Sequence, residues 1–276
     1  MMATAGAVRA GGWDCAIHIY ERDRPLVPSA TFQPPHAPLA DYLRERDSLG
    51  LSRVVLSQPT AYGFDNSLLL EGLCQLGEAG RGIVVIHPDI ADAELDHLHA
   101  LGVRGVRFML FAGGVLDWAA VEPIARRVAR VGWHLKFQLD GRRFAELAPT
   151  LAGLPVRSVI DLHLGSFPAD VDADSAAADA LCRGLDDDWC WVSLSAPYPI
   201  WPTLGRAPEV LLALPRRAVA TRPDRCIWSS NWPHVNVSPT PLPRAGLDWL
   251  ERVIPDAAQR CAVLEDNPGS LFGPVS

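Results

Sequence analysis

The sequence predicts an α/β fold, a distorted (β/α)8 TIM barrel formed by a single domain over residues 1–276. The chain has 276 residues, 49% of them hydrophobic, and a barrel of this kind typically takes about 250 residues. Short apolar segments alternate with helical ones along the whole chain, which is the pattern of a parallel sheet covered by helices. Eight such units favour a closed barrel over an open sheet. No G-x-G-x-x-G or G-x-x-x-x-G-K element follows the first strand, which disfavours an open nucleotide-binding sheet.

Each expected strand is a short apolar run, as is typical of strands buried on both faces of a parallel sheet. We expect eight of them, at Trp13–Ile19, Arg53–Ser57, Gly82–Ile86, Gly105–Leu110, His134–Leu139, Ser158–Leu162, Trp191–Ser195 and Cys226–Ser229.

The expected helices lie between the strands and carry apolar residues at helical spacing. The segment Asp65–Leu76 begins with an Asp-Asn pair that can cap a helix N-terminus. The other expected helices are Leu39–Leu49, Asp92–Leu101, Asp117–Val131, Arg143–Leu151, Asp174–Leu185, Pro208–Leu214, Leu242–Val253 and Ala257–Leu264. Residues 1–12 are small and weakly polar, and we expect them to form a flexible N-terminal segment without the apolar core of a signal peptide.

The composition of the chain limits the classes of partner that we expect it to bind. The net charge is −7, from 25 basic and 32 acidic residues, and no long basic run occurs, so we expect no nucleic-acid partner. No apolar stretch approaches the roughly 20 residues of a membrane span. The six cysteines form no C-x-x-C pair. We therefore expect a cytoplasmic protein with reduced thiols, no membrane contact, no metal or other cofactor and a small-molecule substrate. The sequence leaves the oligomeric state open and is compatible with a homodimer.

The ends of barrel strands are where catalytic residues gather. In the first strand, alternation places Asp14, Ala16 and His18 on one face, so His18 can line a pocket; the alternative is a histidine satisfied by a backbone carbonyl. Arg107 ends an otherwise apolar fourth strand. It can hold a substrate carboxylate, or it can belong to an internal salt bridge.

The loop after the second strand is dense in hydroxyls and amides and leads into a helix N-terminus, where an anion can bind. Ser57 and Tyr62 are its candidate substrate-binding residues, whereas Asp65 and Asn66 are better explained as ordinary helix caps. The remaining strand ends add the candidates Gln138, His163, Ser195, Tyr198, Asn231, Trp232 and His234, with Trp201 as a further apolar wall.

In their order along the chain, these motifs resemble the amidohydrolase superfamily, in its amidohydrolase-related branch (amidohydrolase 2), and are most similar to the 2-pyrone-4,6-dicarboxylate lactonase group. The resemblance covers nearly the whole chain. It is carried by Asp14-x-x-x-His18, Ser57-Gln58-Pro59, Tyr62-Gly63, Asp65-Asn66, 102–108, 138–141, His163-Leu164-Gly165, Leu194-Ser195, Pro197-Tyr198, 228–234, Asp266-Asn267-Pro268 and Leu271-Phe272-Gly273.

The resemblance implies a distorted barrel with its site at the carboxyl ends of the strands. In the wider superfamily, an Asp-x-His-x-His strand, a strand-five residue, a strand-six His and a strand-eight Asp hold one or two metal ions. The lactonase group needs no metal. There, two strand-one histidines and the strand-six histidine surround the lactone carbonyl, arginines bind substrate carboxylates, and the strand-eight Asp is the general base. His18, His163 and Arg107 stand at matching positions.

The sequence departs from that pattern at three positions. Ala16 replaces the first strand-one histidine, Asn231 replaces the strand-eight carboxylate, and Pro199 stands where a lactonase arginine can occur. With two imidazoles left, a metal site is not expected, because such sites take at least three protein ligands. An amide has no useful basicity, so Asn231 cannot replace the general base.

Three hypotheses remain. The first is a metal-independent hydrolase that acts on a small carboxylate-bearing lactone, ester or carbonyl compound, with His18, His163 and Asn231 as catalytic residues and with His18 or His163 replacing the missing base. The second is a non-hydrolytic enzyme on the same scaffold, namely a cyclase, isomerase, lyase or decarboxylase. The third is a catalytically inactive binding homologue. Fold alone does not separate them.

Overall fold

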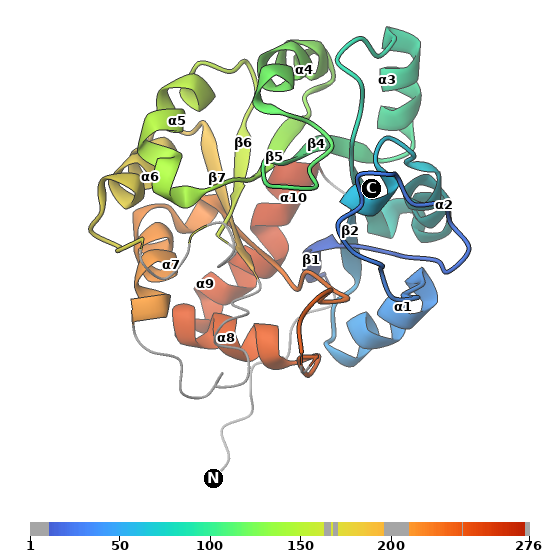
Figure 1. The fold of residues 1–276 in the computed structure, drawn as a ribbon. Coiled ribbons are helices and arrows are strands. Elements are labelled where there is room, and N and C mark those ends of the chain that lie inside the picture. The colour runs from blue at the N-terminus through green and yellow to red at the C-terminus, as the bar shows by residue number, and fades with distance from the viewer. Residues whose placement is uncertain (1–10, 163–166, 168–170, 196–209, 239, 274–276) are drawn as a thin grey trace.

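A computed structural model describes residues 11–162, 167, 171–195, 210–238 and 240–273 of the protein. Eight parallel strands form one sheet in the order β1 to β8, and helices surround it (Figure 1). The strands are β1 Trp13–Ile17, β2 Arg53–Ser57, β3 Gly80–Val84, β4 Val103–Met109, β5 His134–Gln138, β6 Ser158–Asp161, β7 Cys190–Ser195 and β8 Cys226–Ser229. The predicted eight-stranded α/β barrel in a single domain is thereby confirmed. Of the segment 1–12, which was expected to be flexible, residues 1–10 lie outside the described part.

Two backbone hydrogen bonds join the ends of the sheet just beyond β8. The N–H of Asn231 donates to the carbonyl of Ala16 at 3.0 Å, and the N–H of His18 donates to the carbonyl of Trp232 at 2.8 Å. The segment that follows β8 therefore lies against the end of β1, and the barrel closes at the level of the candidate site.

The strands are covered by helices of five to twelve residues (Figure 1). These are α1 Leu39–Ser48, α2 Ser67–Leu76, α3 Asp92–Ala100, α4 Val121–Val128, α5 Phe144–Ala152, α6 Ala176–Asp186, α7 Val210–Thr221 and α8 Ala245–Val253, followed by the short α9 Ala257–Cys261 and by α10 Asn267–Phe272. None of the helices in the described ranges is long and apolar enough to cross a membrane.

Two predicted helix ends were wrong. The helix predicted to stop at Leu214 continues through Pro215 to Thr221, because Ala218 and Val219 are buried beyond the proline and their burial offsets the backbone hydrogen bond that a proline removes. The last helix was predicted to stop at Leu264. It continues through a π-helical segment at Ala262–Asp266 into α10.

The start of α2 shows how the loop after β2 is held. Asp65 caps the helix, since its Oδ1 accepts the N–H of Ser67 at 3.0 Å. Asn66 does not cap it. Its side chain bonds both backbone groups of Val85, with Nδ2 donating to the carbonyl at 2.8 Å and Oδ1 accepting the N–H at 3.1 Å. The loop is therefore tied to the segment that follows β3.

The first strand contains a β-bulge, and this makes one prediction wrong. The register with β2 shifts between Asp14 and Ile17. Trp13 and Cys15 pack in the apolar interior, whereas Ala16 and His18 line the cavity above it. Asp14 therefore does not share a face with Ala16 and His18. It points outward to α1, because one extra residue in a strand reverses the alternation beyond it.

The lower half of the barrel is filled with apolar side chains. Phe272 of α10 closes it and stacks on Trp13 with ring centroids 5.7 Å apart. The interior cluster consists of Trp13, Cys15, Val55, Ile83, Val159, Trp191, Ile227 and Phe272. The polar side chains that line a cavity lie above this cluster, at the carboxyl ends of the strands, where a barrel site is expected. Other buried polar residues, Arg81, His134 and Ser158, lie at the amino ends of β3, β5 and β6.

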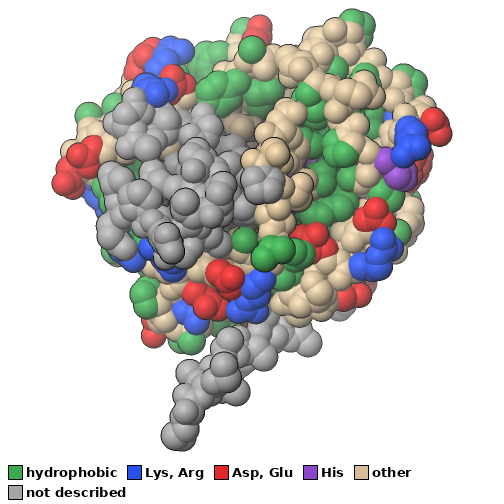
Figure 2. Space-filling model, turned by 60° about the horizontal axis from the view of Figure 1, so that its bottom comes forward, with side chains coloured by type: hydrophobic (Ala, Val, Ile, Leu, Met, Phe, Trp, Pro, Cys, Tyr) green, Lys and Arg blue, Asp and Glu red, His purple; other side chains and the backbone are tan. Residues whose placement is uncertain are grey.

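On the face of the molecule in Figure 2, acidic and basic side chains lie next to one another. Exposed ion pairs of this kind occur between Arg244 and Asp248 at 3.1 Å and between Arg222 and Asp224 at 2.9 Å. Such exposed pairs stabilise the fold by at most about 1 kcal/mol each.

Candidate active site

A small cavity lies at the carboxyl ends of the strands, and all strands except β3 contribute to it. Six of the eleven predicted site residues line it: His18, Ser57, Arg107, Gln138, Ser195 and Asn231. The other lining residues are Ala16, Lys136, Asp161 and Ser229. The alternation of inward and outward side chains along each strand brings these residues together.

His18 lines the cavity and also bonds a backbone carbonyl. The sequence analysis offered these two roles as alternatives, and the structure shows both. Its Nδ1 lies 2.8 Å from the carbonyl oxygen of Ser57. Since a carbonyl only accepts hydrogen bonds, Nδ1 carries the proton. Burial and the positive charge of Arg107 lower the pKa of His18 to about 3. The ring is therefore neutral at pH 7, and Nε2 is a hydrogen-bond acceptor.

Asn231 is held against this acceptor. Its φ of 61° is left-handed, a conformation that asparagine tolerates better than most residues. The structure places the amide oxygen Oδ1 3.2 Å from Nε2 of His18. A neutral Nε2 without a proton and an amide oxygen both only accept hydrogen bonds, so we assign the NH₂ to this position by exchanging the oxygen and nitrogen of the amide, which leaves Oδ1 on the opposite side.

Arg107 crosses the cavity between two neutral oxygens. It donates to the carbonyl of Gln58 at 2.7 Å and to the side-chain oxygen of Gln138 at 3.3 Å. Burial lowers the pKa of this guanidinium, although arginine stays charged under ordinary conditions. Its hydrogen bonds therefore fix its position without neutralising its charge.

Lys136 and Asp161 form a buried ion pair that our sequence analysis did not single out. The Lys136 ammonium lies 2.8 Å from Oδ1 of Asp161, and the two side chains are only 3% and 13% exposed. A usable signal existed, since Lys136 stands two residues before Gln138 in an apolar strand and so shares its inward face.

The charges that line the cavity do not cancel. Arg107 and Lys136 contribute two positive charges, Asp161 contributes one negative charge, and neutral His18 adds none, which gives +1. A net positive charge at a partly buried site favours an anionic ligand.

The other predicted site residues do not line this cavity or cannot be placed. The Tyr62 hydroxyl accepts the N–H of Glu21 at 3.1 Å and lies 3.3 Å from its carbonyl. Trp232 packs on Tyr42 of α1 with ring centroids 5.5 Å apart. His234 is buried, which lowers its pKa to about 4, but it lies away from the cavity lining. His163, Tyr198 and Trp201 lie outside the described residues.

Behind the cavity wall, Asp14 fixes the turn that carries Asn231. Its carboxylate accepts the N–H of Ser230 at 2.8 Å, the Ser230 hydroxyl at 2.5 Å and the Tyr42 hydroxyl at 3.1 Å. The Ser230 hydroxyl oxygen in turn accepts the N–H of Trp232 at 3.0 Å. Burial raises the pKa of Asp14 to about 6, although these hydrogen bonds oppose the rise.

The family model described as Amidohydrolase matches residues 13–273. The chain belongs to the amidohydrolase family. It is 30% identical over 283 residues to the 2-pyrone-4,6-dicarboxylate hydrolase of Comamonas testosteroni, covering 96% of this chain and 91% of that protein. It is also 30% identical over 275 residues to the D-galactarolactone isomerase of Agrobacterium fabrum, covering 95% and 91%. An apo crystal structure of ATU3138 from Agrobacterium tumefaciens has a TM-score of 0.89 at 28% identity, covering 98% and 99%.

The donor set of this amidohydrolase-family protein does not fit a metal ion within the described ranges. No three His, Cys, Asp or Glu side chains come together there in a way that could hold one. At the cavity, Ala16 offers no donor, Asn231 offers an amide, and the Asp161 carboxylate is engaged by Lys136.

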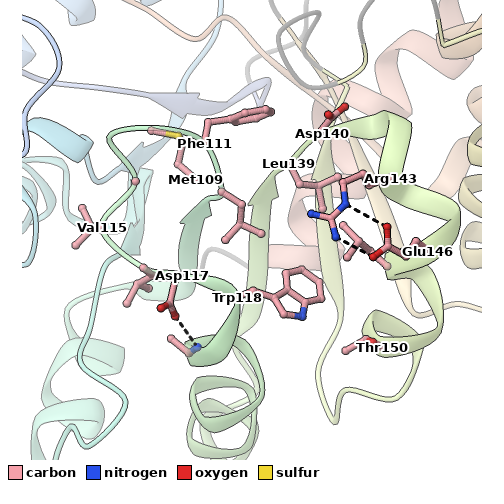
Figure 3. A pocket seen from close by; sticks show the side chains of 15 residues that line it. Met109, Phe111, Val115, Asp117, Trp118, Leu139, Asp140, Arg143, Glu146 and Thr150 are labelled. Carbon is pink, nitrogen blue, oxygen red and sulfur yellow. Dashed lines mark hydrogen bonds and ion pairs between the residues drawn. The ribbon is translucent and has the colours of Figure 1, made fainter.

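A larger hollow lies outside the barrel, between the segment after β4 and helix α5 (Figure 3). Its walls include Met109, Phe111 and Trp118, with the exposed Arg143–Glu146 ion pair at one side. None of the predicted site residues lines it. The small cavity inside the barrel is therefore the better candidate for the active site, because the charged and polar groups converge there.

Proposed function

We propose that this amidohydrolase-family protein is a metal-independent enzyme that opens the ring ester of a small anionic lactone, with water as the acceptor. The observation that carries the proposal is the cavity itself, which joins the neutral His18–Asn231 pair to the uncompensated charge of Arg107. The 30% identity to a 2-pyrone-4,6-dicarboxylate hydrolase supports the same substrate class.

Each group has a distinct role in this proposal. Arg107 binds a substrate carboxylate through its remaining N–H donors, because a guanidinium has five and the protein uses two. His18 orients the Asn231 amide. The amide oxygen, which can accept two hydrogen bonds, positions the nucleophile. His163 remains a predicted catalytic residue through the family resemblance alone.

A second candidate is isomerisation, in which a hydroxyl of the substrate takes the place of water. Asn231 favours this candidate, because an amide in place of a carboxylate cannot deprotonate water. A hydroxyl tethered to the reacting carbonyl has a high effective concentration and depends less on such activation. A relative at 30% identity is a D-galactarolactone isomerase.

One experiment separates the candidates. Metal-stripped protein is incubated with a panel of lactones and pyrone carboxylates at several pH values, in water labelled with heavy oxygen. Hydrolysis gives a ring-opened acid with the label in its carboxylate, whereas isomerisation gives an unlabelled lactone of different ring size. Neither product from folded protein would refute both candidates and favour a binding homologue.

His18→Ala tests the role of the pair. Loss of the ring leaves the Asn231 amide unoriented, and we expect turnover to fall by about 100-fold. His97→Ala serves as the control, since His97 is exposed on α3. An unchanged rate in His18→Ala would remove His18 from the site.

We also infer from the sequence that the protein is cytoplasmic and that its ligand is a small anionic molecule. The homodimer remains a prediction, and analytical ultracentrifugation tests it.

A further inference from the structure

Opening a lactone with water requires that the water lose a proton as its oxygen attacks the carbonyl carbon. Two polar groups at the cavity are poorly suited to accept it. The pKa of His18 is lowered to about 3 by burial and by Arg107, and its Nε2 faces Asn231. The amide of Asn231 has no useful basicity. Asp161 is the one carboxylate among the described residues that line the cavity.

The strand register places this carboxylate at the level where the cavity opens. Lys136 pairs with Val159 and Phe137 with Ile160, so Asp161 lies one step further along, beside Gln138. The Lys136 side chain extends from the lower level and contacts Oδ1. A carboxylate has about four acceptor positions on two oxygens, and the ammonium lies against only one of these oxygens, Oδ1.

The buried pair is difficult to explain as a stabilising device. Removing both charges from water is costly, and apolar side chains of similar size often stabilise a fold as well or better. The level immediately below is filled with apolar side chains such as Val159 and Trp191. The change from an apolar interior to a buried ion pair coincides with the candidate site, which points to a role in the reaction.

We infer that Asp161 is the catalytic base of this site and that Lys136 is the cation that holds its carboxylate toward the cavity; the inference rests on the proposed lactone-opening function. One proton of the water passes to Asp161 as the C–O bond forms at the lactone carbonyl carbon. The ring C–O bond then breaks, and the same proton passes to the departing alkoxide oxygen. The base is regenerated, and one water is consumed for each ring opened.

The test compares Asp161→Asn with wild-type protein on a lactone that the wild type turns over. General-base catalysis is worth about 10²–10⁴-fold, so kcat should fall by that factor while KM changes little. Asp161→Ala should recover part of the rate as formate is added, because formate can supply a carboxylate in the vacated space. A purely structural role would give no formate-dependent recovery.

The double variant Lys136→Met/Asp161→Leu keeps the test valid if a single variant fails to fold. It removes both members of the pair, so neither is left buried without the other, and it should fold and be as inactive as Asp161→Asn. Circular dichroism and thermal unfolding check the fold of each variant.

Activity within about tenfold of wild type in folded Asp161→Asn or in the double variant would overturn the role of Asp161 and leave lactone opening standing. Absence of turnover by the wild type across the panel would overturn the proposed function, and the catalytic base with it.

Discussion

Two buried carboxylates lie on opposite sides of the barrel wall and are held by different chemistry. Asp161 faces the cavity and is paired with the Lys136 ammonium. Asp14 faces α1 and is held by neutral donors, the N–H and hydroxyl of Ser230 and the hydroxyl of Tyr42. Neutral donors do not fully replace water for an ion, and burial therefore raises the pKa of Asp14 to about 6. Asp14 therefore fixes the backbone at Ser230 through its hydrogen bonds. Asp161, in contrast, forms an ion pair at the cavity.

The bulge in β1 produces this division. Without the register shift between Asp14 and Ile17, strict alternation would place Asp14 and His18 on one face. The extra residue puts Asp14 behind the wall, where it holds Ser230, and leaves His18 in the cavity beside Asn231. The comparison therefore separates a positioning carboxylate from a reacting one, and variants of each should behave differently.

The largest expected effect on stability comes from Lys136→Met. The substitution leaves the Asp161 carboxylate buried without its cation, and breaking a buried pair in this way costs about 3–5 kcal/mol. Urea unfolding of the variant and the wild type measures the loss. The double variant Lys136→Met/Asp161→Leu should regain most of it, because neither member of the pair is left without the other. A loss below about 1 kcal/mol in the single variant would show that the pair is effectively solvated, as exposed pairs are.

The second effect is a pH dependence of stability to which Asp14 should contribute. Its pKa rises from 3.8 to about 6 on folding, so the native state binds the proton more tightly. The stabilisation is fully present below pH 3.8 and is lost as the pH rises through about 6. A difference of 6 − 3.8 = 2.2 pKa units corresponds to about 3 kcal/mol. Wild type should therefore gain about 2 kcal/mol relative to Asp14→Asn between about pH 7 and about pH 4, and the remainder at lower pH.

Urea unfolding of both proteins across this range measures the difference. Glu45, whose pKa is also raised to about 6, mainly by burial and then by the charge of Asp14, is present in both proteins. Its own titration therefore largely cancels in the comparison. A difference that does not change with pH would show that Asp14 does not titrate in this range.

The strands of this chain could be predicted from sequence to within two residues at each end, because each strand is a short apolar run whose inward positions alternate. That rule identified Arg107, Gln138 and Ser195 as cavity residues. The bulge could not be predicted, since a one-residue insertion leaves no mark in the run 13–19. The same alternation puts Lys136 on the inward face with Gln138, but the sequence does not show that its partner is Asp161 on the next strand.

The loop residues were predicted less well, because local backbone geometry decides where they point. Trp232 follows Asn231, whose left-handed φ turns the chain. Its ring then packs on Tyr42, and its side chain hydrogen-bonds Glu45. Tyr62 has a polar end suited to a pocket, but the backbone of Glu21 occupies its hydroxyl. Composition shows that such side chains can bind a substrate, whereas their orientation depends on contacts between distant segments.

The smallest expected effect comes from Tyr42→Phe, which removes one hydrogen bond from Asp14 and leaves the bonds from Ser230 in place. The cost should be about 1 kcal/mol. This hydrogen bond favours the charged carboxylate, so the cost should be larger above pH 6, where Asp14 is ionised, than near pH 4. Tyr62→Phe is the matched control, because it also removes a buried hydroxyl, but one whose partner is the backbone of Glu21. Its cost should stay constant over the same pH range in urea unfolding. If the two variants show the same pH dependence, the Tyr42 hydroxyl does not stabilise the Asp14 charge, and the hydrogen bonds from Ser230 and from the N–H of Ala16 hold that carboxylate behind the site.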